Sequence, residues 1–364
     1  MGAVAAAEHV PIGRRVALTY GVSRLHPNST VGGDGRRSGR SPLRAPRAKP
    51  ERRWATTLPQ RRLLSPAVRA DGTLLIASAG GLHALSADGR SLFFAPVGPL
   101  RHTPSLTPRG DALVSTYEGR LLLVGRAGES RPIFDEASRI SMPLMLDGGA
   151  LVVGGRDGQV QVLDLDGSIL LSLPVAAREA SFTADLGGGR ALAGGAAREL
   201  TVLSLHGGRE APLLLEEVVA RAVAVDDRGG LWVVGVSGTL FGLEADGRVR
   251  VRVDLGPRAM TTAPVVDREG GTCVGLAVQE VRCYDRDGRE RFRRGSDGRP
   301  GELLLDADDN LLFTTSRGIL YCIDREGELR WTFPTTARGA LRPVLGSDGS
   351  VIVVSDDGRV QALK

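Results

Sequence analysis

Few residues of this chain have types and spacings suited to redox or metal chemistry. The three cysteines, Cys273, Cys283 and Cys322, include no Cys-x-x-Cys pair, so the sequence predicts neither a zinc site nor a disulfide framework. Cys283 and Cys322 occupy one position of an internal repeat that elsewhere holds small or apolar residues, and we expect both to be buried. Cys273 should lie on the strand beside Cys283. A cross-strand disulfide between these two cysteines remains an alternative and would require an oxidising compartment.

Two other polar patterns could bind metal or catalyse a reaction. Asp306, Asp308 and Asn310 alternate as in calcium loops, but Leu311 stands where such loops use glycine. The segment also aligns with polar turns of the other repeats, so we favour a turn. The five histidines share no metal spacing, and none lies near a Ser or Cys arranged for a triad. We therefore expect no catalytic, metal-binding or cofactor-binding residues.

Arginines recur in the segments that connect successive repeats. If these segments open on one face, the arginines could form a ring that attracts an acidic ligand or partner. Arg is also abundant, since only Lys49 and Lys364 among the 47 basic residues are lysines. One arginine per segment is therefore also what abundance alone would supply. The candidate contacts are Arg101, Arg139, Arg178, Arg221, Arg258 and Arg338.

A repeat of 39–41 residues extends over most of the chain. Its copies align at LHALS, LLLVG, VQVLD, LTVLS, LFGLE, VRCYD, LYCID and VQALK, which begin at residues 82, 121, 160, 200, 240, 281, 320 and 360. Each copy combines a strand after a recurrent Pro, an apolar strand, an alternating strand and, after an Asp/Gly turn, an outer strand. Eight such units predict an all-β, eight-bladed β-propeller of four-stranded antiparallel blades.

The last copy, VQALK, lacks an outer strand. The segment ERRWATTLP at 51–59 resembles ELRWTFP at 328–334 and belongs to no other unit. We expect the strand around Trp54 to complete the last blade, so that an N-terminal strand closes the ring and leaves no unpaired edge.

The charge is distributed unevenly. Residues 1–64 hold 13 Lys and Arg against 3 Asp and Glu, whereas the remainder holds 34 against 39. We expect residues 1–49 to be a disordered basic tail and residues 50–364 to form the propeller. The acidic body argues against specific nucleic-acid binding. No apolar window is long enough for a transmembrane helix, and no signal peptide is visible. The sequence as it stands predicts a cytoplasmic protein, or an envelope protein if the true start differs.

The units GLHALSADGRSLFFA, GTLFGLEADGRVRV and GILYCIDREGELRWTF resemble the PQQ-like propeller repeat. The family includes quinoprotein dehydrogenases, which bind pyrroloquinoline quinone (PQQ) and calcium, and non-catalytic scaffolds of outer-membrane assembly. The dehydrogenases are longer and often carry adjacent cysteines, which this chain lacks. The resemblance therefore implies a monomeric, non-catalytic scaffold for a protein partner, without PQQ or calcium. The alternative is a PQQ-binding or other propeller enzyme, an oxidoreductase or lyase, with its site at the channel mouth.

Overall fold

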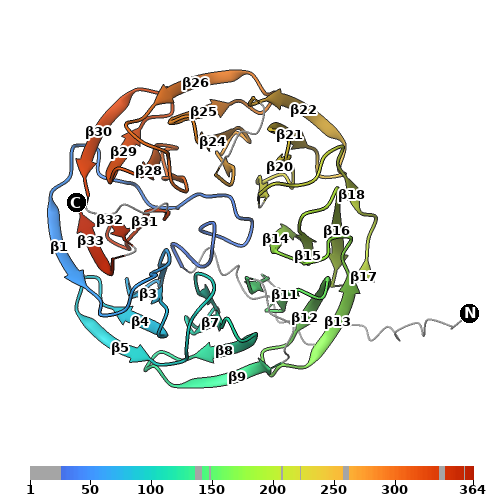
Figure 1. Ribbon diagram of the computed structural model, residues 1–364, viewed down its shortest axis with the longest axis horizontal. Coiled ribbons are helices and arrows are strands. Elements are labelled where there is room, and N and C mark those ends of the chain that lie inside the picture. Colours follow the sequence, from blue (N-terminus) through green and yellow to red (C-terminus); the bar gives the residue numbers. More distant parts are fainter. Residues whose placement is uncertain are drawn as a thin grey trace, which may run out of the picture.

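The computed structural model describes residues 26–364 apart from 136–141, 147–148, 206–207, 222, 257–261, 336–340 and 356. Every element in the described part is a β-strand, and the strands form eight antiparallel sheets arranged around a ring (Figure 1). The predicted eight-bladed β-propeller is confirmed. We number the blades in chain order, so that blade 1 contains β2–β5 and blade 8 contains β31–β33 and β1.

Each blade runs from an inner strand at the channel to an outer strand at the rim. The inner strands are β2 (Ala67–Val68), β6 (Ser105–Leu106), β10 (Leu144–Met145), β14 (Phe182–Gly187), β19 (Ala224–Val225), β23 (Val265–Val266), β27 (Leu304–Leu305) and β31 (Val344–Leu345). The second strands are β3 (Leu74–Ala77), β7 (Ala112–Ser115), β11 (Leu151–Gly154), β15 (Arg190–Gly194), β20 (Leu231–Val234), β24 (Thr272–Leu276), β28 (Leu311–Thr314) and β32 (Val351–Val354).

The third strands are β4 (Leu82–Leu85), β8 (Arg120–Val124), β12 (Gln159–Leu163), β16 (Glu199–Ser204), β21 (Thr239–Leu243), β25 (Glu280–Tyr284), β29 (Ile319–Ile323) and β33 (Arg359–Leu363). The outer strands are β5 (Ser91–Ala95), β9 (Ser130–Asp135), β13 (Ile169–Pro174), β22 (Val249–Asp254), β26 (Glu290–Gly295), β30 (Leu329–Pro334) and β1 (Arg52–Thr57). Blade 4 is irregular, because two short strands, β17 (Gly208–Arg209) and β18 (Leu213–Leu214), share its outer edge.

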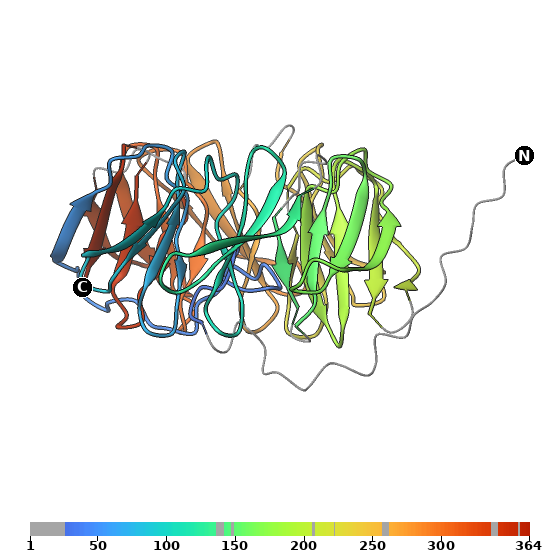
Figure 2. The same ribbon diagram turned by 90° about the horizontal axis from the view of Figure 1, so that it is seen from below.

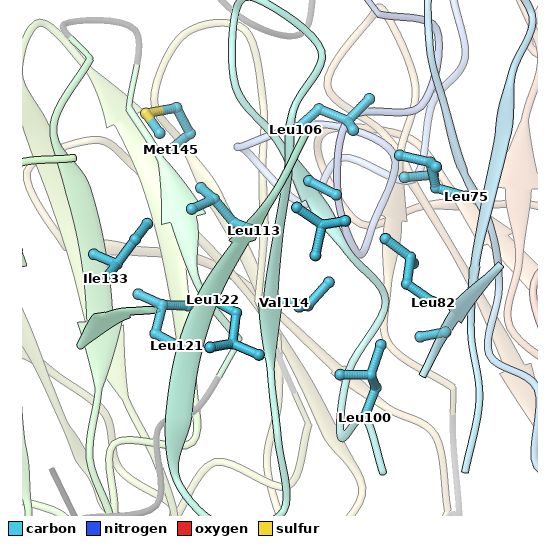
Figure 3. Close-up of a cluster of buried hydrophobic side chains, with 14 of the residues drawn as sticks. Leu75, Leu82, Leu100, Leu106, Leu113, Val114, Leu121, Leu122, Ile133 and Met145 are labelled. Atoms are coloured by element: carbon cyan, nitrogen blue, oxygen red, sulfur yellow. The ribbon is translucent and has the colours of Figure 1, made fainter. Parts of the chain in front are cut away.

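The core lies between neighbouring blades. The second strand of every blade is wholly or almost wholly buried, because both of its faces pack against another sheet. Figure 3 shows one such layer, in which Leu75 and Leu82 of blade 1 and Leu113 and Leu121 of blade 2 belong to one apolar cluster that continues to Met145 of blade 3. Alternation of apolar residues in the repeat therefore produces interblade packing.

The glycine that recurs in the last turn of the repeat allows contact between neighbouring blades. Gly89 has φ of 83°, and a Cβ added there would lie 2.6 Å from Cε3 of Trp54 in the preceding blade. The Trp54 indole also donates an Nε1–H bond of 2.9 Å to the carbonyl of Ala87. Equivalent contacts join Phe93 to Gly128, Leu213 to Gly247, Val251 to Gly288 and Phe292 to Gly327. We call these contacts the rim clasps.

The ring closes as the sequence predicts. Strand β1 pairs with β33 in antiparallel register, with Trp54 opposite Ala362 and Thr57 opposite Arg359. Blade 8 therefore combines three strands from the C-terminal end of the chain with one that precedes blade 1. Figure 1 shows β1 lying outside β33, where the first and last blades meet. This closure satisfies the backbone edge that β33 would otherwise expose.

Candidate functional site

The segment from residue 28 to residue 43, which we call the channel segment, occupies the centre of the ring (Figure 1). Its carbonyls accept backbone hydrogen bonds of 2.7–3.0 Å from the inner strands of six blades. The donor and acceptor pairs are Val68 and Asn28, Leu106 and Ser29, Asp185 and Gly35, Val225 and Arg36, Val266 and Ser38, and Leu305 and Gly39. The channel is therefore lined by a strip of chain that no repeat contains.

The expectation of disorder for residues 1–49 does not hold for residues 26–49. Composition suggested disorder because the segment lacks apolar periodicity, but its order comes from backbone hydrogen bonds to the blades rather than from a core of its own. Its glycines permit close approach. A Cβ on Gly39, whose φ is 73°, would lie 2.2 Å from Cγ1 of Val265. Residues 1–25 lie outside the described residues, and the domain boundary near residue 50 stays a proposal.

The channel segment lies towards one face of the ring. Figure 2, in which the ring is seen edge-on, places this blue segment in the half of the disc that carries the C terminus. The loops that lead into the inner strands lie at the end of those strands that is opposite to the channel segment. A cavity of about 260 Å³ lies between the channel segment and these loops. Val31, Gly32 and Arg37 line it from the segment.

The opposite wall of the cavity is formed by residues at one position of the repeat. This position directly precedes the recurrent Pro, or its equivalent where Pro is absent. The lining residues at this position are Ser65, Thr103, Met142, Ala263, Glu302 and Arg342. Blades 1, 2, 3 and 6 place neutral residues at those lining positions, whereas blades 7 and 8 place charges. Arg221 of blade 5 also lines the cavity and is exposed, so the cavity reaches solvent beside this side chain.

Arg37 brings a buried cation to the cavity. Its side chain donates Nε–H to the carbonyl of Thr183 at 2.8 Å and Nη1–H to the carbonyl of Val31 at 2.7 Å. Its Nη2 is buried and has no hydrogen-bond partner among the described residues. The residue is 4% exposed and has φ of 58°, a left-handed conformation that costs free energy outside glycine. The backbone strain and the unpartnered nitrogen occur in the same residue.

Arg342 is a second buried cation on the cavity and is 7% exposed. Its Nη2 lies 3.9 Å from Oε2 of Glu302, a long ion pair. Its Nε and Nη1 are buried without a hydrogen-bond partner in the part of the chain that the structure describes. Glu302 therefore offsets the charge of Arg342 but leaves most of its donors unused.

The pKa values express the cost of this burial. Burial lowers the pKa of Arg37 to about 10; the carboxylate of Asp34 opposes that shift, and the charge of Arg342 adds to it. Burial also lowers the pKa of Arg342, against the charges of Glu302 and Asp34. For Glu302 and Asp34 burial raises the pKa. Both guanidinium groups stay charged at neutral pH, so the cavity is electropositive.

Three of the six predicted contact arginines can be placed. Arg221 lines the cavity, Arg178 is exposed, and Arg101 is half-buried with its Nη2 at 3.3 Å from Oε1 of Glu179. Arg139, Arg258 and Arg338 lie outside the described residues. The proposed ring of six arginines therefore stays a prediction, and one member reaches the cavity.

Arg37 and Arg342 were not predicted from the sequence. Arg342 directly precedes Pro343, and aligning that position over the repeats would have shown Glu302 and Arg342 replacing Ser65 and Thr103. Arg37 has no such signal, because it lies in a segment without repeats.

The cysteines lie away from the cavity lining. Cys273 and Cys283 are opposite each other on β24 and β25 and form a disulfide, the alternative that the sequence left open. Cys322 is buried as predicted, and burial raises the pKa of its thiol to about 12. A thiol with this pKa is a poor nucleophile at neutral pH.

Asp306 caps its own turn. One of its oxygens accepts the N–H groups of Asp308 and Asn310, and the other accepts from the Asn310 amide and from the N–H of Ala45. Asp226 and Asp267 cap the corresponding turns of blades 5 and 6 through N–H groups two and four residues onward. The pattern that resembled a calcium loop is thus a repeated turn.

The described residues lack two features that would indicate other kinds of function. They contain no group of three His, Cys, Asp or Glu side chains placed to hold a metal ion. They also contain no helix long and apolar enough to span a membrane.

The fold and repeats define an eight-bladed β-propeller, and comparison with known proteins shows what it resembles. Residues 277–364 match the family model described as "Outer membrane protein assembly factor BamB". The predicted resemblance to the PQQ-like propeller family is confirmed. No curated protein sequence matches the chain significantly.

Solved structures share the fold at low sequence identity. BamB from Moraxella catarrhalis aligns with a TM-score of 0.69 at 15% identity, covering 86% of this chain and 99% of its own. Saccharomyces cerevisiae Sqt1 aligns with a TM-score of 0.70 at 14% identity, covering 85% and 97%. The computationally designed Ika8 protein gives 0.71 at 15% identity, covering 84% and 98%. At such identity the likeness establishes the fold alone.

Proposed function

We propose that this protein is a non-catalytic scaffold that binds a protein partner on the face where the loops enter the inner strands. The observation that carries the proposal is a set of exposed apolar side chains on that face. Tyr117, Val236 and Val278 are 57%, 53% and 71% exposed. Each lies in the turn between the second and third strands of its blade.

The entry loops support these turns. Tyr117 donates its N–H to the carbonyl of Pro99, and Val236 donates to that of Val218, which joins turn and loop into one surface. The three side chains lie in blades 2, 5 and 6, so they are distributed around one face of the ring rather than gathered in one patch. Exposed apolar side chains on one face favour an interaction surface. Arg101, Arg178 and Arg221 come from the same loops and would favour an acidic partner.

The comparisons favour the same kind of function. BamB, whose family model matches residues 277–364, is an assembly factor for outer-membrane proteins, so we infer a role in assembling or holding other proteins. The Cys273–Cys283 disulfide favours an oxidising compartment such as the bacterial envelope. An envelope location is thus part of the proposal.

The test is capture of partners from envelope and soluble fractions of the source cells. Substituting Tyr117, Val236 and Val278 together by Ser should abolish capture of the partner, because the apolar contacts supply the binding free energy. The matched control substitutes three exposed leucines of the rim, Leu92, Leu214 and Leu329, by Ser and should leave capture intact. Equal capture by both variants would contradict the choice of face. Reversing Arg178 to Glu should reduce capture less strongly.

A further inference from the structure

We propose that the central cavity binds a small organic anion, whose carboxylate or phosphate group accepts hydrogen bonds from Arg37 and Arg342 and whose apolar part contacts the cavity wall. This ligand site goes beyond the scaffold function and does not depend on it, because Tyr117, Val236 and Val278 of the partner surface do not line the cavity. Arg221 belongs to both regions.

The unused donors of the two arginines carry the proposal. Nη2 of Arg37 and both Nε and Nη1 of Arg342 are buried without hydrogen-bond partners among the described residues, and both side chains line the cavity. Burying guanidinium N–H groups without acceptors destabilises a fold, so native proteins rarely leave several around one space. An anion with two or more oxygens supplies the missing acceptors, and guanidinium groups match its geometry.

The charges around the cavity indicate the sign of the ligand's charge. Arg37, Arg221 and Arg342 contribute three positive charges to its lining, whereas Glu302 is the one carboxylate among the described residues there. Asp34, the other nearby carboxylate, accepts hydrogen bonds from N–H and Oγ–H of Ser38 and does not line the cavity. The lining therefore carries excess positive charge, and its ligand is an anion.

The rest of the wall excludes a purely inorganic ion as the preferred ligand. Val31, Met142, Val223, Ala263 and Val344 give the cavity an apolar side. A volume of about 260 Å³ lies just below the usual range for small-molecule sites, so the ligand is small. A ligand with one anionic group and a short apolar body would use both the arginines and this wall.

The backbone holds Arg37 in place for this role. A Cβ on Gly32 would lie 2.8 Å from Cα of Arg37, so the turn from Gly32 to Arg37 is tightly packed. Arg37 itself has φ of 58°. Strained residues held by surrounding structure concentrate at functional sites, and here the strain accompanies a preorganised donor.

The experiment measures ligand affinity by calorimetry and Tm by thermal unfolding, with the full chain at constant ionic strength. The probes are benzoate, phenyl phosphate, inorganic phosphate and the neutral benzamide. Benzoate or phenyl phosphate should bind saturably and raise Tm, since a ligand of the native state stabilises it. Inorganic phosphate should bind about tenfold more weakly, and benzamide should not bind.

Variants assign the site. Arg37→Gln and Arg342→Gln should each weaken organic-anion binding by about tenfold or more. Arg69→Gln is the matched control: Arg69 is 2% exposed and its Nη2 is also unpartnered in the described chain, but it does not line the cavity. This control should bind the anion with wild-type affinity.

Arg342→Lys retains the positive charge and replaces Arg342→Gln if that variant does not fold. Where both variants fold, Arg342→Lys should bind the organic anion more tightly than Arg342→Gln. Three results would overturn the proposal: no saturable binding of either organic anion at millimolar concentration, equal binding of benzamide, or wild-type affinity in both Gln variants. Inorganic phosphate binding as tightly as phenyl phosphate would show that the apolar wall contributes nothing, and the organic ligand class would then be wrong.

Discussion

Two segments that precede blade 1 both complete the ring, but by different means. Strand β1 adds a regular antiparallel ladder to β33, and its Trp54 repeats a rim clasp found between other blades. The channel segment instead contacts six blades, with one to three backbone hydrogen bonds at each, and has no counterpart in any repeat. One segment continues the symmetry of the propeller and the other breaks it.

The difference shows where stability and specificity lie in this fold. Repeated contacts at the rim bury apolar surface in the same way around the ring, so they stabilise it without distinguishing any blade. The channel places different side chains at equivalent positions, with Ser65 and Thr103 in two blades and Glu302 and Arg342 in two others. A ligand requires such asymmetry, and the channel segment adds to it with Arg37.

The largest expected effect comes from deleting residues 51–58, which contain β1. Without β1, β33 loses its outer neighbour and blades 8 and 1 lose the clasp between Trp54 and Gly89. We expect a large fall in the free energy of unfolding and loss of a single cooperative transition, measured by urea denaturation with two spectroscopic probes.

The matched deletion variant lacks residues 1–45 and retains Pro46, whose carbonyl accepts a 2.8 Å bond from Nε1 of Trp331. It should unfold cooperatively at a lower Tm, because the closed ring remains while the channel hydrogen bonds are lost. If this deletion destroys cooperativity and the deletion of 51–58 does not, the roles assigned to the two segments are reversed.

A smaller effect should follow from Gly89→Ala, which tests a rim clasp directly. Both the positive φ and the Trp54 ring oppose a Cβ there, and we expect a loss of about 3 kcal/mol in the free energy of unfolding. Gly98→Ala is the control, because Gly98 has φ of 86° but no atom within 4 Å of an added Cβ. It should cost about 1 kcal/mol. Equal losses would show that the clasp adds nothing.

The smallest effect, taken over a single pH unit, concerns acid stability near the channel. Burial, followed by the charges of Arg101 and Arg37, lowers the pKa of His102 from 6.5 to about 3. Below pH 6.5 the unfolded chain takes up a proton that the folded protein does not bind until about pH 3. The free energy of unfolding should therefore fall on acidification through this window, by about 1 kcal/mol per pH unit for this histidine.

His102→Gln should flatten that pH profile in urea titrations. His83→Gln should flatten it less, because burial alone lowers the pKa of His83, without a neighbouring positive charge. Profiles of His102→Gln and wild type that run parallel would assign the acid sensitivity to other groups.

The sequence predicts the parts of this molecule that recur. Eight copies of one pattern establish the blades, and the likeness of residues 51–59 to 328–334 identifies β1, because regular strands need repeated alternation and turns. The channel segment gives no such pattern: its order depends on hydrogen bonds to residues far along the chain, such as those that join Gly39 and Ser41 to Leu305, which composition cannot reveal. An alignment of the repeats could have identified Arg342, whereas Arg37 could be identified only from the three-dimensional structure.

The bond between Trp331 and Pro46 also has a consequence for the order of events during biosynthesis. The ribosome makes Pro46 and the channel segment first, but the Trp331 partner in blade 7 emerges 285 residues later. This hydrogen bond can therefore form only after nearly all blades have been synthesised. Contacts of such long sequence separation form slowly, so filling the channel and closing the ring should be the final steps of folding.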